Sequence, residues 1–537
     1  MLTQPDELTS SSLVRGAKPA DADPSPPAIV SERTTAALLA RNATLNLFTE
    51  GVLFVVLLVA MPPLVAHLGT QAFGLYALGW SVIGYLAYLE LGVSRSATQF
   101  VSKYLSQENS IGVRQTATTA ILSNLCIGIA SSIVVLLLAP LLTQTVFHIP
   151  IELRGQAKWV FYSVALAVPV VMLQAVFRAI AASYQEFVSI NVVNAVGTAV
   201  QFALACSLAA KGFGVGVVVF STVVIRIGFT FSYGVLVFGL VPRLFHPSDF
   251  HLGELRKLLC FGGWVTISQL ILQMLTYLDR ILLASFGSLS AVTYFTVPFE
   301  GITRLRVIPS GMMATVYPAM TESTDTQARK KFQALYENSV RYILLLLLPL
   351  ICFLVVFGKV MLAAWMGAAF ATHSALVFQI LAVGFFLNSL AFVSYHAIQA
   401  VERPDAVGKY HLIILPVYIG LSIFLISHGG ISGAAIAASL RFGLDALVLF
   451  WMAERYCGCS MRFLRGPSAV RIIVLGGLLL LLSILIRQLV ANAWLSLSLG
   501  LLGVASYFFL VWHFLLNSRE KPAVIQALGL SRSLKIV

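Results

Sequence analysis

Charged side chains are concentrated within apolar sequence between residues 262 and 320 of this chain. They are Asp279, Arg280, Glu300, Arg304 and Arg306. A charged group at the centre of a bilayer costs about 2.5–3.5 kcal/mol on insertion scales, so such groups face a protein interior or a watery cavity. The arginine fork binds phosphate or carboxylate oxygens through paired hydrogen bonds, and a carboxylate at low dielectric can carry a proton. This stretch is therefore our candidate for the working centre.

Helical spacing places several of these residues on shared faces, because side chains four residues apart on a helix lie above one another. The first predicted stripe is Gln269, Gln273, Tyr277 and Arg280, the second is Thr296, Glu300 and Arg304, and the third is Asn42, Asn46 and Glu50. Such stripes predict a polar path through the protein. Pro298 and Pro309 predict bends in the helices that carry the second stripe.

Some of these charges have a purely structural alternative. Glu300 and Arg304 are four residues apart and could simply neutralise each other. For Arg441 and Asp445, which have the same spacing, we favour the structural interpretation, and for Arg226 we favour packing. Two further candidates, Arg95 and Arg178, lie near predicted helix ends, where a long side chain can reach the interface instead of a site.

The remaining motifs point to transport and not to covalent chemistry. Glu50, Asp279 and Glu300 are the candidates for coupling to a proton or sodium gradient. The sequence contains no phosphate-cradling GxxxxGK[ST] and no nucleophile motif, and Cys457 and Cys459 have no partner pair at zinc spacing. We therefore predict a protein that is not an enzyme and holds no metal or cofactor. Tyr76, Tyr85, Tyr88 and Tyr294 could offer rings to sugars, although interface anchoring is the favoured interpretation.

The elements that position these residues are predicted to be membrane helices. Of the 537 residues, 58% are hydrophobic and only 11% are charged, against about 25% charged in soluble domains. The net charge of +13 is spread between apolar runs and forms no cluster, which excludes nucleic acid as a partner. The all-α fold should contain about fourteen spans. They are placed near 42–66, 73–100, 117–140, 157–183, 187–210, 215–241, 258–285, 290–318, 338–358, 372–400, 408–428, 431–453, 468–490 and 493–516.

Lysine and arginine are distributed unevenly between the two sides of the predicted bundle. The loops on one side hold only Arg154, Lys158, Lys211, Lys359 and Arg487, and the other basic residues lie on the side of the termini. The positive-inside rule therefore predicts that both termini are cytoplasmic. The predicted divisions are a disordered tail over 1–40, an N-lobe over 41–242, a C-lobe over 243–455, two further helices over 456–517 and a cytoplasmic tail over 518–537.

The two lobes repeat each other weakly. Residues 64–78 resemble 282–296 at one fixed offset, which aligns Gly69 with Gly287 and Tyr76 with Tyr294. Because six predicted helices separate the copies, the halves share one orientation and are related by an axis along the membrane normal. Repeats of this kind are typical of transporters that bind substrate at the interface between the halves.

Three stretches carry a resemblance to a known family. RNATLNLF with LVAHLGTQAFGLYALGWSVIGYLAYLELGVSRSATQFVSKY resembles the first helical hairpin of the bacterial polysaccharide transporters, the Wzx-type flippases of the multidrug/oligosaccharidyl-lipid/polysaccharide superfamily. YLDRILLASFGSLSAVTYFTVPFEGITRL resembles the hairpin that opens their second half, and GGISGAAIAASL resembles their twelfth helix. The likeness covers roughly residues 41–460.

The resemblance implies a two-lobed, V-shaped bundle in the bacterial inner membrane. Its substrate would be an undecaprenyl-pyrophosphate-linked oligosaccharide, moved by alternating access and handed to a polysaccharide polymerase and a chain-length regulator. The pyrophosphate and sugar would then be held by Arg280, Arg304, Arg306, Arg95, Arg178, Gln269, Gln273 and Tyr277. The alternatives are a multidrug exporter or a lipid II flippase of the same superfamily and, more remotely, a membrane-embedded polymerase or glycosyltransferase.

Overall fold

The computed structural model describes residues 36–87, 90, 92–147, 149–242, 244, 250–323, 329–515 and 521. Side chains are described for these residues except at 36–44, 47, 87, 260–270 and 272. Most of the predicted tails, 1–40 and 518–537, therefore lie outside the described residues.

The described chain is built of helices. The first half contains α1 (Ala36–Leu68), α2 (Thr70–Ala87), α3 (Val93–Ser106), α4 (Ser110–Leu141), η3 (Leu142–Val146), α5 (Ile151–Ser183), α6 (Phe187–Ala210) and α7 (Val215–Leu240). The second half contains α8 (Leu252–Phe286), α9 (Leu289–Thr303), η4 (Arg304–Arg306), α10 (Val307–Thr321), α11 (Arg329–Met366), α12 (Ala368–Ala400) and α13 (Pro404–Cys457). The chain continues with η6 (Met461–Arg465), α14 (Pro467–Leu489), α15 (Ala493–Leu510) and η7 (Val511–Leu515). In lipid a backbone must satisfy its own hydrogen bonds, and helices do so within one segment.

The all-helical fold confirms the predicted class, whereas the predicted number of spans is not confirmed. Within the described residues, ten helices are long and apolar enough to cross a membrane. The 54-residue α13 counts once, although it turns sharply at Gly430 (φ 52°, ψ −127°) between the predicted spans 408–428 and 431–453. The predicted spans 73–100 and 290–318 are each broken into two shorter helices. Fourteen therefore stays a prediction.

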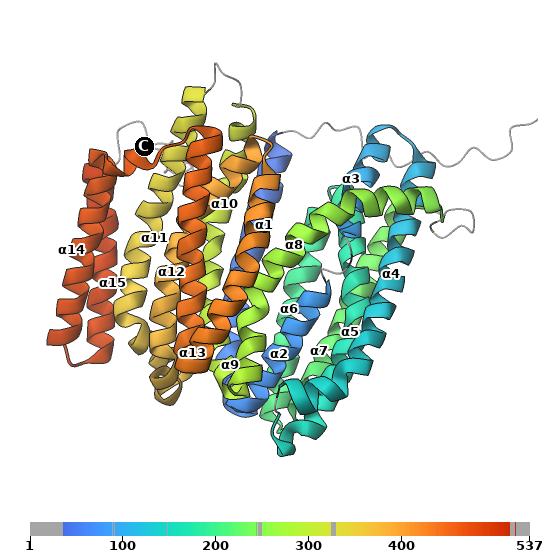
Figure 1. Cartoon of the computed structure of the whole chain (residues 1–537), viewed down its shortest axis with the longest axis horizontal. Helices are drawn as coiled ribbons and strands as arrows, with labels where there is room; N and C mark the ends of the chain where they lie inside the picture. The colour runs from blue at the N-terminus through green and yellow to red at the C-terminus, as the bar shows by residue number, and fades with distance from the viewer. Residues whose placement is uncertain are drawn as a thin grey trace, which may run out of the picture.

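The helices form two groups (Figure 1). In the first group α5 packs against α4 and α7, and α6 packs against α1 and α7. In the second group α12 packs against α11 and α13, while α14 and α15 lie beyond α11. The helix α8 joins the groups, because it contacts α3 and α4 as well as α13. Figure 1 shows α8 running diagonally between them.

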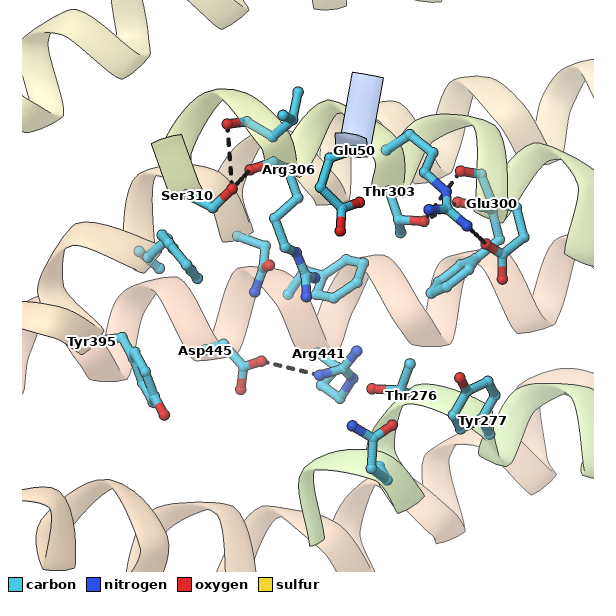
Figure 2. Close-up of a pocket in the computed structure, with 18 of the residues that line it drawn as sticks. Glu50, Thr276, Tyr277, Glu300, Thr303, Arg306, Ser310, Tyr395, Arg441 and Asp445 are labelled. Carbon is cyan, nitrogen blue, oxygen red and sulfur yellow. Dashed lines mark hydrogen bonds and ion pairs between the residues drawn. The ribbon is translucent and has the colours of Figure 1, made fainter. Parts of the chain in front are cut away.

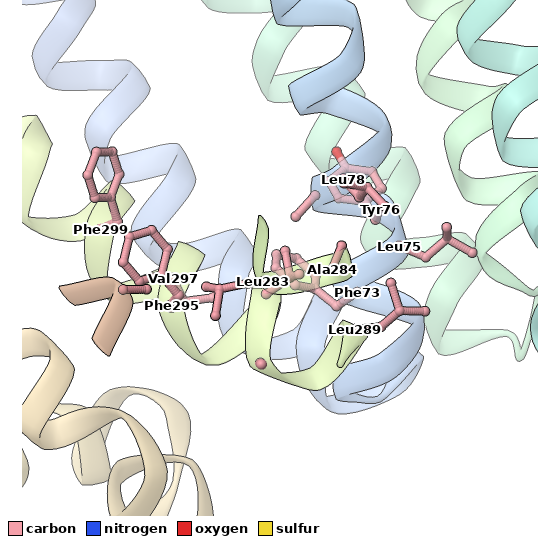
Figure 3. Packing of buried hydrophobic residues seen from close by; sticks show 14 of the residues in the cluster. Phe73, Leu75, Tyr76, Leu78, Leu283, Ala284, Leu289, Phe295, Val297 and Phe299 are labelled. Carbon is pink, nitrogen blue, oxygen red and sulfur yellow. The ribbon is translucent and has the colours of Figure 1, made fainter. Parts of the chain in front are cut away.

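The two groups meet closely where α2 packs on α9, the two helices that the internal repeat relates to each other (Figure 3). A Cβ added to Gly74 on α2 would lie 1.8 Å from the Leu289 carbonyl oxygen, so only glycine permits this approach. The Thr293 hydroxyl donates to the Thr70 carbonyl oxygen at 2.6 Å, and the Thr70 and Ser290 hydroxyls lie 3.0 Å apart. Phe73 and Leu289 are buried in this contact. We refer to these residues on α2 and α9 as the apex.

Candidate functional site

A cavity of about 740 Å³ lies between the two groups of helices. Its wall includes residues of α1, α3, α8, α9, η4, α10, α12 and α13. Eight of the predicted site residues line it, namely Glu50, Arg95, Gln273, Tyr277, Arg280, Glu300, Arg304 and Arg306. Glu50 lies 18 residues before Leu68, the end of α1, which is about 27 Å along a helix at about 1.5 Å per residue. The cavity therefore reaches far from the apex.

One carboxylate organises the arginines on the α8 and α9 side of the cavity. Arg280 Nη2 donates to Glu300 Oε1 at 2.6 Å, and Arg304 Nη2 lies 3.6 Å from Glu300 Oε2. The Arg280 guanidinium also lies 5.1 Å from the Tyr277 ring centroid and 5.4 Å from that of Phe299. Arg280 is therefore fixed on several sides. The sequence offered an ion pair between Glu300 and Arg304. In the structure the Glu300 carboxylate lies closer to Arg280 than to Arg304.

A second ion pair lines the cavity from the last part of α13. Arg441 Nη1 lies 3.2 Å from Asp445 Oδ2, and Asp445 Oδ1 accepts a hydrogen bond of 2.7 Å from the Tyr410 hydroxyl. Arg441 also lies over the Tyr418 and Phe442 rings. The sequence favoured a structural role for this pair. The ion pair is present, and both residues also line the cavity.

Two arginines on the cavity wall have no such partner. Arg95 and Arg306 are exposed, and neither lies within 4 Å of a carboxylate in the described part of the chain. Figure 2 shows Arg306 reaching from the start of α10 toward Arg441, with the Glu50 carboxylate pointing into the same space. The wall contains five arginines and three carboxylates, a formal excess of two positive charges. This excess suits an anion.

The remaining predicted site residues lie elsewhere. Asp279 is 1% exposed behind the cavity wall, where both of its carboxylate oxygens lie 2.7 Å from the Tyr418 hydroxyl. Arg178 is exposed on α5 and does not line the cavity. Asn46 accepts a hydrogen bond from Asn191 on α6 instead of facing the cavity. The side chains of Gln269 and Asn42 lie outside the described ones.

Sequence reasoning missed the contribution of α12. Asn388, Ala391, Phe392, Tyr395 and His396 line the cavity from one face of this helix. Their spacing of three, four, seven and eight residues is a helical face, but α12 is apolar on most of its surface and gives no clear periodicity. The tyrosines considered for sugars, Tyr76, Tyr85 and Tyr294, do not line the cavity, and Tyr88 is outside the described residues.

Among the described residues no group of three or more histidine, cysteine, aspartate or glutamate side chains is placed to hold a metal ion. Cys457 and Cys459 are buried and free. What the cavity offers is charge, hydrogen bonds and aromatic rings. This set of groups can bind and orient a substrate.

Comparison with known proteins agrees with this picture. The chain is 24% identical to the "Putative O-antigen transporter" of Shigella flexneri over 425 residues, which is 78% of this chain and 98% of that protein. Its fold is similar to that of an inward-facing multidrug resistance MATE family transporter of the MOP superfamily, with a TM-score of 0.64, 14% identity and coverage of 79% of this chain and 98% of that one.

The lipid II flippase MurJ in an inward closed conformation is equally similar, with a TM-score of 0.64, 14% identity and coverage of 89% of this chain and 98% of that one. At these identities the two structures establish the fold and nothing finer. The sequence itself goes further, because the profile of one family matches residues 39–324. The chain therefore belongs to the family described as polysaccharide biosynthesis protein.

Proposed function

We propose that this protein is a flippase that carries an undecaprenyl-pyrophosphate-linked oligosaccharide across the bacterial inner membrane. The observation that carries the proposal is the cavity with five arginines, two of which have no carboxylate partner among the described residues. A pyrophosphate needs several fixed cations, and arginine stays charged when it is desolvated. Membership in a polysaccharide biosynthesis family and the name of the Shigella flexneri relative support a transport role.

The arginines divide the binding task. Arg280, Arg304 and Arg441 already have carboxylate partners, so they shape the wall and add positive potential. Arg95 and Arg306 have hydrogen-bond donors to spare, and we assign the phosphates to them. Truncating one partner of a buried charge pair is costly, whereas an arginine without a partner can be occupied by substrate without breaking an ion pair.

Movement of the substrate would follow alternating access. The lobes meet at the apex, and the cavity lies between them away from it. α1 begins and α15 ends on the side of the molecule opposite the apex (Figure 1). With cytoplasmic termini, as the sequence predicts, the cavity would face the cytoplasm, where the lipid-linked precursor is made. Rocking of the lobes would then part the apex and release the substrate outside.

An ion gradient would drive the cycle. Asp279 is buried and accepts a hydrogen bond from the Tyr418 hydroxyl. Burial penalises the charged form of a carboxylate, so a group in such a place can take up a proton or hold a small cation. Glu300 and Glu50 line the cavity and are the other candidates. We propose H⁺ or Na⁺ as the coupling ion, and a polysaccharide polymerase and a chain-length regulator as partner proteins.

The composition of the cavity also weighs against the nearest alternative. A multidrug exporter that takes cationic drugs would need an acidic cavity, and this cavity carries more arginine than carboxylate. A lipid II flippase would bind the same pyrophosphate chemistry, so only the sugar separates it from our proposal.

The experiment compares Arg306→Ala with Arg471→Ala in cells that lack the native protein. Arg471 is an exposed arginine near the start of α14 and does not line the cavity. We expect lipid-linked oligosaccharide to accumulate on the cytoplasmic face with Arg306→Ala and to reach the outer face with Arg471→Ala, at equal protein levels. Normal outward display with Arg306→Ala, or with the whole protein deleted, would contradict the proposal.

A further inference from the structure

The cavity has one wall of a different chemical kind. On α12 the side chains of Asn388, Phe392, Tyr395 and His396 line it, and we call these four residues the α12 face. The α12 face holds no arginine, lysine or carboxylate, whereas the adjoining wall on α9, η4 and α10 holds Glu300, Arg304 and Arg306. One cavity therefore combines a charged wall with an uncharged aromatic wall.

The rings of the α12 face are packed into a fixed array. The Phe392 and His396 ring centroids lie 4.3 Å apart, and the Tyr395 and His396 centroids lie 5.3 Å apart. Tyr317 of α10 meets the edge of His396 at 5.7 Å. Figure 2 shows Tyr395 projecting from its helix into the pocket. Rings held in this way offer apolar surface at little cost in conformational entropy.

Polar atoms beside these rings lack partners. The Asn388 side-chain amide makes no hydrogen bond within the described chain, although it has two donors and an acceptor. His396 Nδ1 lies 2.8 Å from the Phe392 carbonyl oxygen, so this nitrogen donates and Nε2 remains as an acceptor. These groups are available to a ligand that has both hydroxyl donors and hydroxyl acceptors.

The α12 face also adjoins a cation that we assign to the phosphates. Arg95 and Tyr395 line the same cavity. In a lipid-linked oligosaccharide the first sugar is bonded directly to the pyrophosphate, so a phosphate site and a sugar site must be neighbours. A cavity of about 740 Å³ is within the range of about 300–1,000 Å³ typical of small-molecule sites, which suits a few sugar residues.

We infer that the α12 face is the sugar-binding subsite of the substrate. A sugar ring has an apolar face of C–H groups and a rim of hydroxyls. The Phe392 and Tyr395 rings would contact the apolar face, while Asn388 and His396 Nε2 exchange hydrogen bonds with the hydroxyls. This inference rests on the proposed function, and it assigns selection between sugars to α12 and retention of the lipid to Arg95 and Arg306.

The test measures binding of two lipids to the purified full-length protein in nanodiscs. One probe is undecaprenyl pyrophosphate without sugar, and the other is the lipid-linked oligosaccharide extracted from cells that lack this protein. We expect Asn388→Ala and Phe392→Ala each to weaken binding of the glycosylated lipid by about tenfold and to change binding of the bare lipid by less than about twofold, since tenfold corresponds to about 1.4 kcal/mol. Tyr395→Phe keeps the ring and should bind the glycosylated lipid more tightly than Tyr395→Ala.

The control on the same helix is Val383→Ala, because Val383 is exposed away from the cavity and should leave both affinities unchanged. Arg306→Ala should weaken both lipids together. Equal losses for the two lipids in the α12 variants, or no loss for either, would overturn the subsite while leaving the flippase proposal intact. Failure of the wild-type protein to bind either lipid, or normal binding of both by Arg306→Ala, would instead overturn the proposed function and the subsite with it.

Discussion

Glu300 is the residue on which the charged wall depends. It contacts both Arg280 and Arg304, and Arg280 has only 5% of its side chain exposed. Removing one member of a buried pair leaves the other charge unpaired in a poor solvent. Glu300 therefore holds the positive wall together besides being a candidate for ion coupling.

We expect Glu300→Gln to lower the free energy of unfolding by roughly 3 kcal/mol, because Arg280 then keeps its charge without a carboxylate. The double variant Arg280→Met with Glu300→Gln should recover most of this loss, since it removes both charges. Thermal unfolding of the purified protein measures both effects. Asp405→Asn is the control, because it breaks an exposed pair with Lys409. Equal stability of Glu300→Gln and the wild type would show that Arg280 is not held by this pair.

Arg306 allows a test of how the substrate is held and not only of whether it is held. A lysine at this position keeps the charge but loses the planar fork that binds two phosphate oxygens at once. We expect transport by Arg306→Lys to lie between that of the wild type and that of Arg306→Ala, with unchanged unfolding temperature. Outward display of the lipid-linked oligosaccharide measures transport. Transport by Arg306→Lys as poor as that by Arg306→Ala would show that the fork, and not the charge, is required.

At the scale of helices, the apex depends on the absence of a side chain at Gly74. A Cβ there would lie 1.8 Å from the Leu289 carbonyl oxygen, which is backbone and cannot move alone. We expect Gly74→Ala to separate α2 from α9 and to shift the protein toward the state that is open on this side. A reporter, Thr293→Cys in a cysteine-free background, should then react faster with a membrane-impermeant thiol reagent added outside, because Thr293 is fully buried in the closed apex.

The matched control for the apex is Gly228→Ala, since Gly228 is a helical glycine with open space around its Cβ position. It should leave the labelling rate unchanged. If Thr293→Cys reacts with the thiol reagent as slowly in the presence of Gly74→Ala as in its absence, the two helices accommodate the methyl group without separating.

The sequence predicted the helices and the polar residues better than the faces those residues occupy. Charges inside apolar runs predict Arg280, Glu300 and Arg304 as residues of a polar path, and all three line the cavity. The role of Arg441 could not be separated from that of Arg226, because helices that are apolar all round give no sign of which side meets lipid and which meets protein. Only the packing of α13 against α8 and α12 places Arg441 on the cavity wall.

Asp279 is a second residue whose surroundings could not be predicted from the sequence. Its neighbour Arg280 reaches the cavity, whereas Asp279 points to α13 and is covered by Tyr418. Adjacent residues on a helix face different directions, so Asp279 and Arg280 cannot both lie on the polar stripe. The sequence does not predict which side chains surround the residue that lies off it. The Gly430 turn, which lies between Tyr418 and Arg441 in α13, is likewise a feature that the sequence pattern does not predict.

For the whole molecule, the cavity is strongly asymmetric despite the repeat. Among the residues whose side chains are described, the first half contributes Glu50, Gly51, Phe54 and Arg95 to its wall, and the other lining residues come from α8 to α13. In the alternating-access cycle that we propose, the first lobe would be mainly the moving cover of a site that the second lobe carries. This division explains why the charges concentrate after residue 262, although the two halves resemble each other in their helices.

The last two helices, α14 and α15, offer a test of which part of the molecule is needed for transport. α14 and α15 pack chiefly against α11, where Leu348 faces Gly476 and Phe357 faces Gly500. None of the residues that line the cavity belongs to them. In a membrane, lipid chains are as apolar as leucine. Removal of α14 and α15 therefore exposes α11 to lipid without a hydrophobic penalty, and the main loss is the packing between these helices and α11.

We therefore expect a chain that ends at Gly466 to insert, to keep the cavity and to retain transport, with a lower unfolding temperature than the full chain. Outward display of the lipid-linked oligosaccharide, measured at equal protein levels, gives the transport activity. The matched control is a full-length chain carrying Gly476→Leu, which should loosen the same contact against Leu348 without removing a helix. If the shortened chain is present in the membrane in normal amount but carries no substrate, α14 and α15 take part in transport, and the two-lobe unit from α1 to α13 is not sufficient.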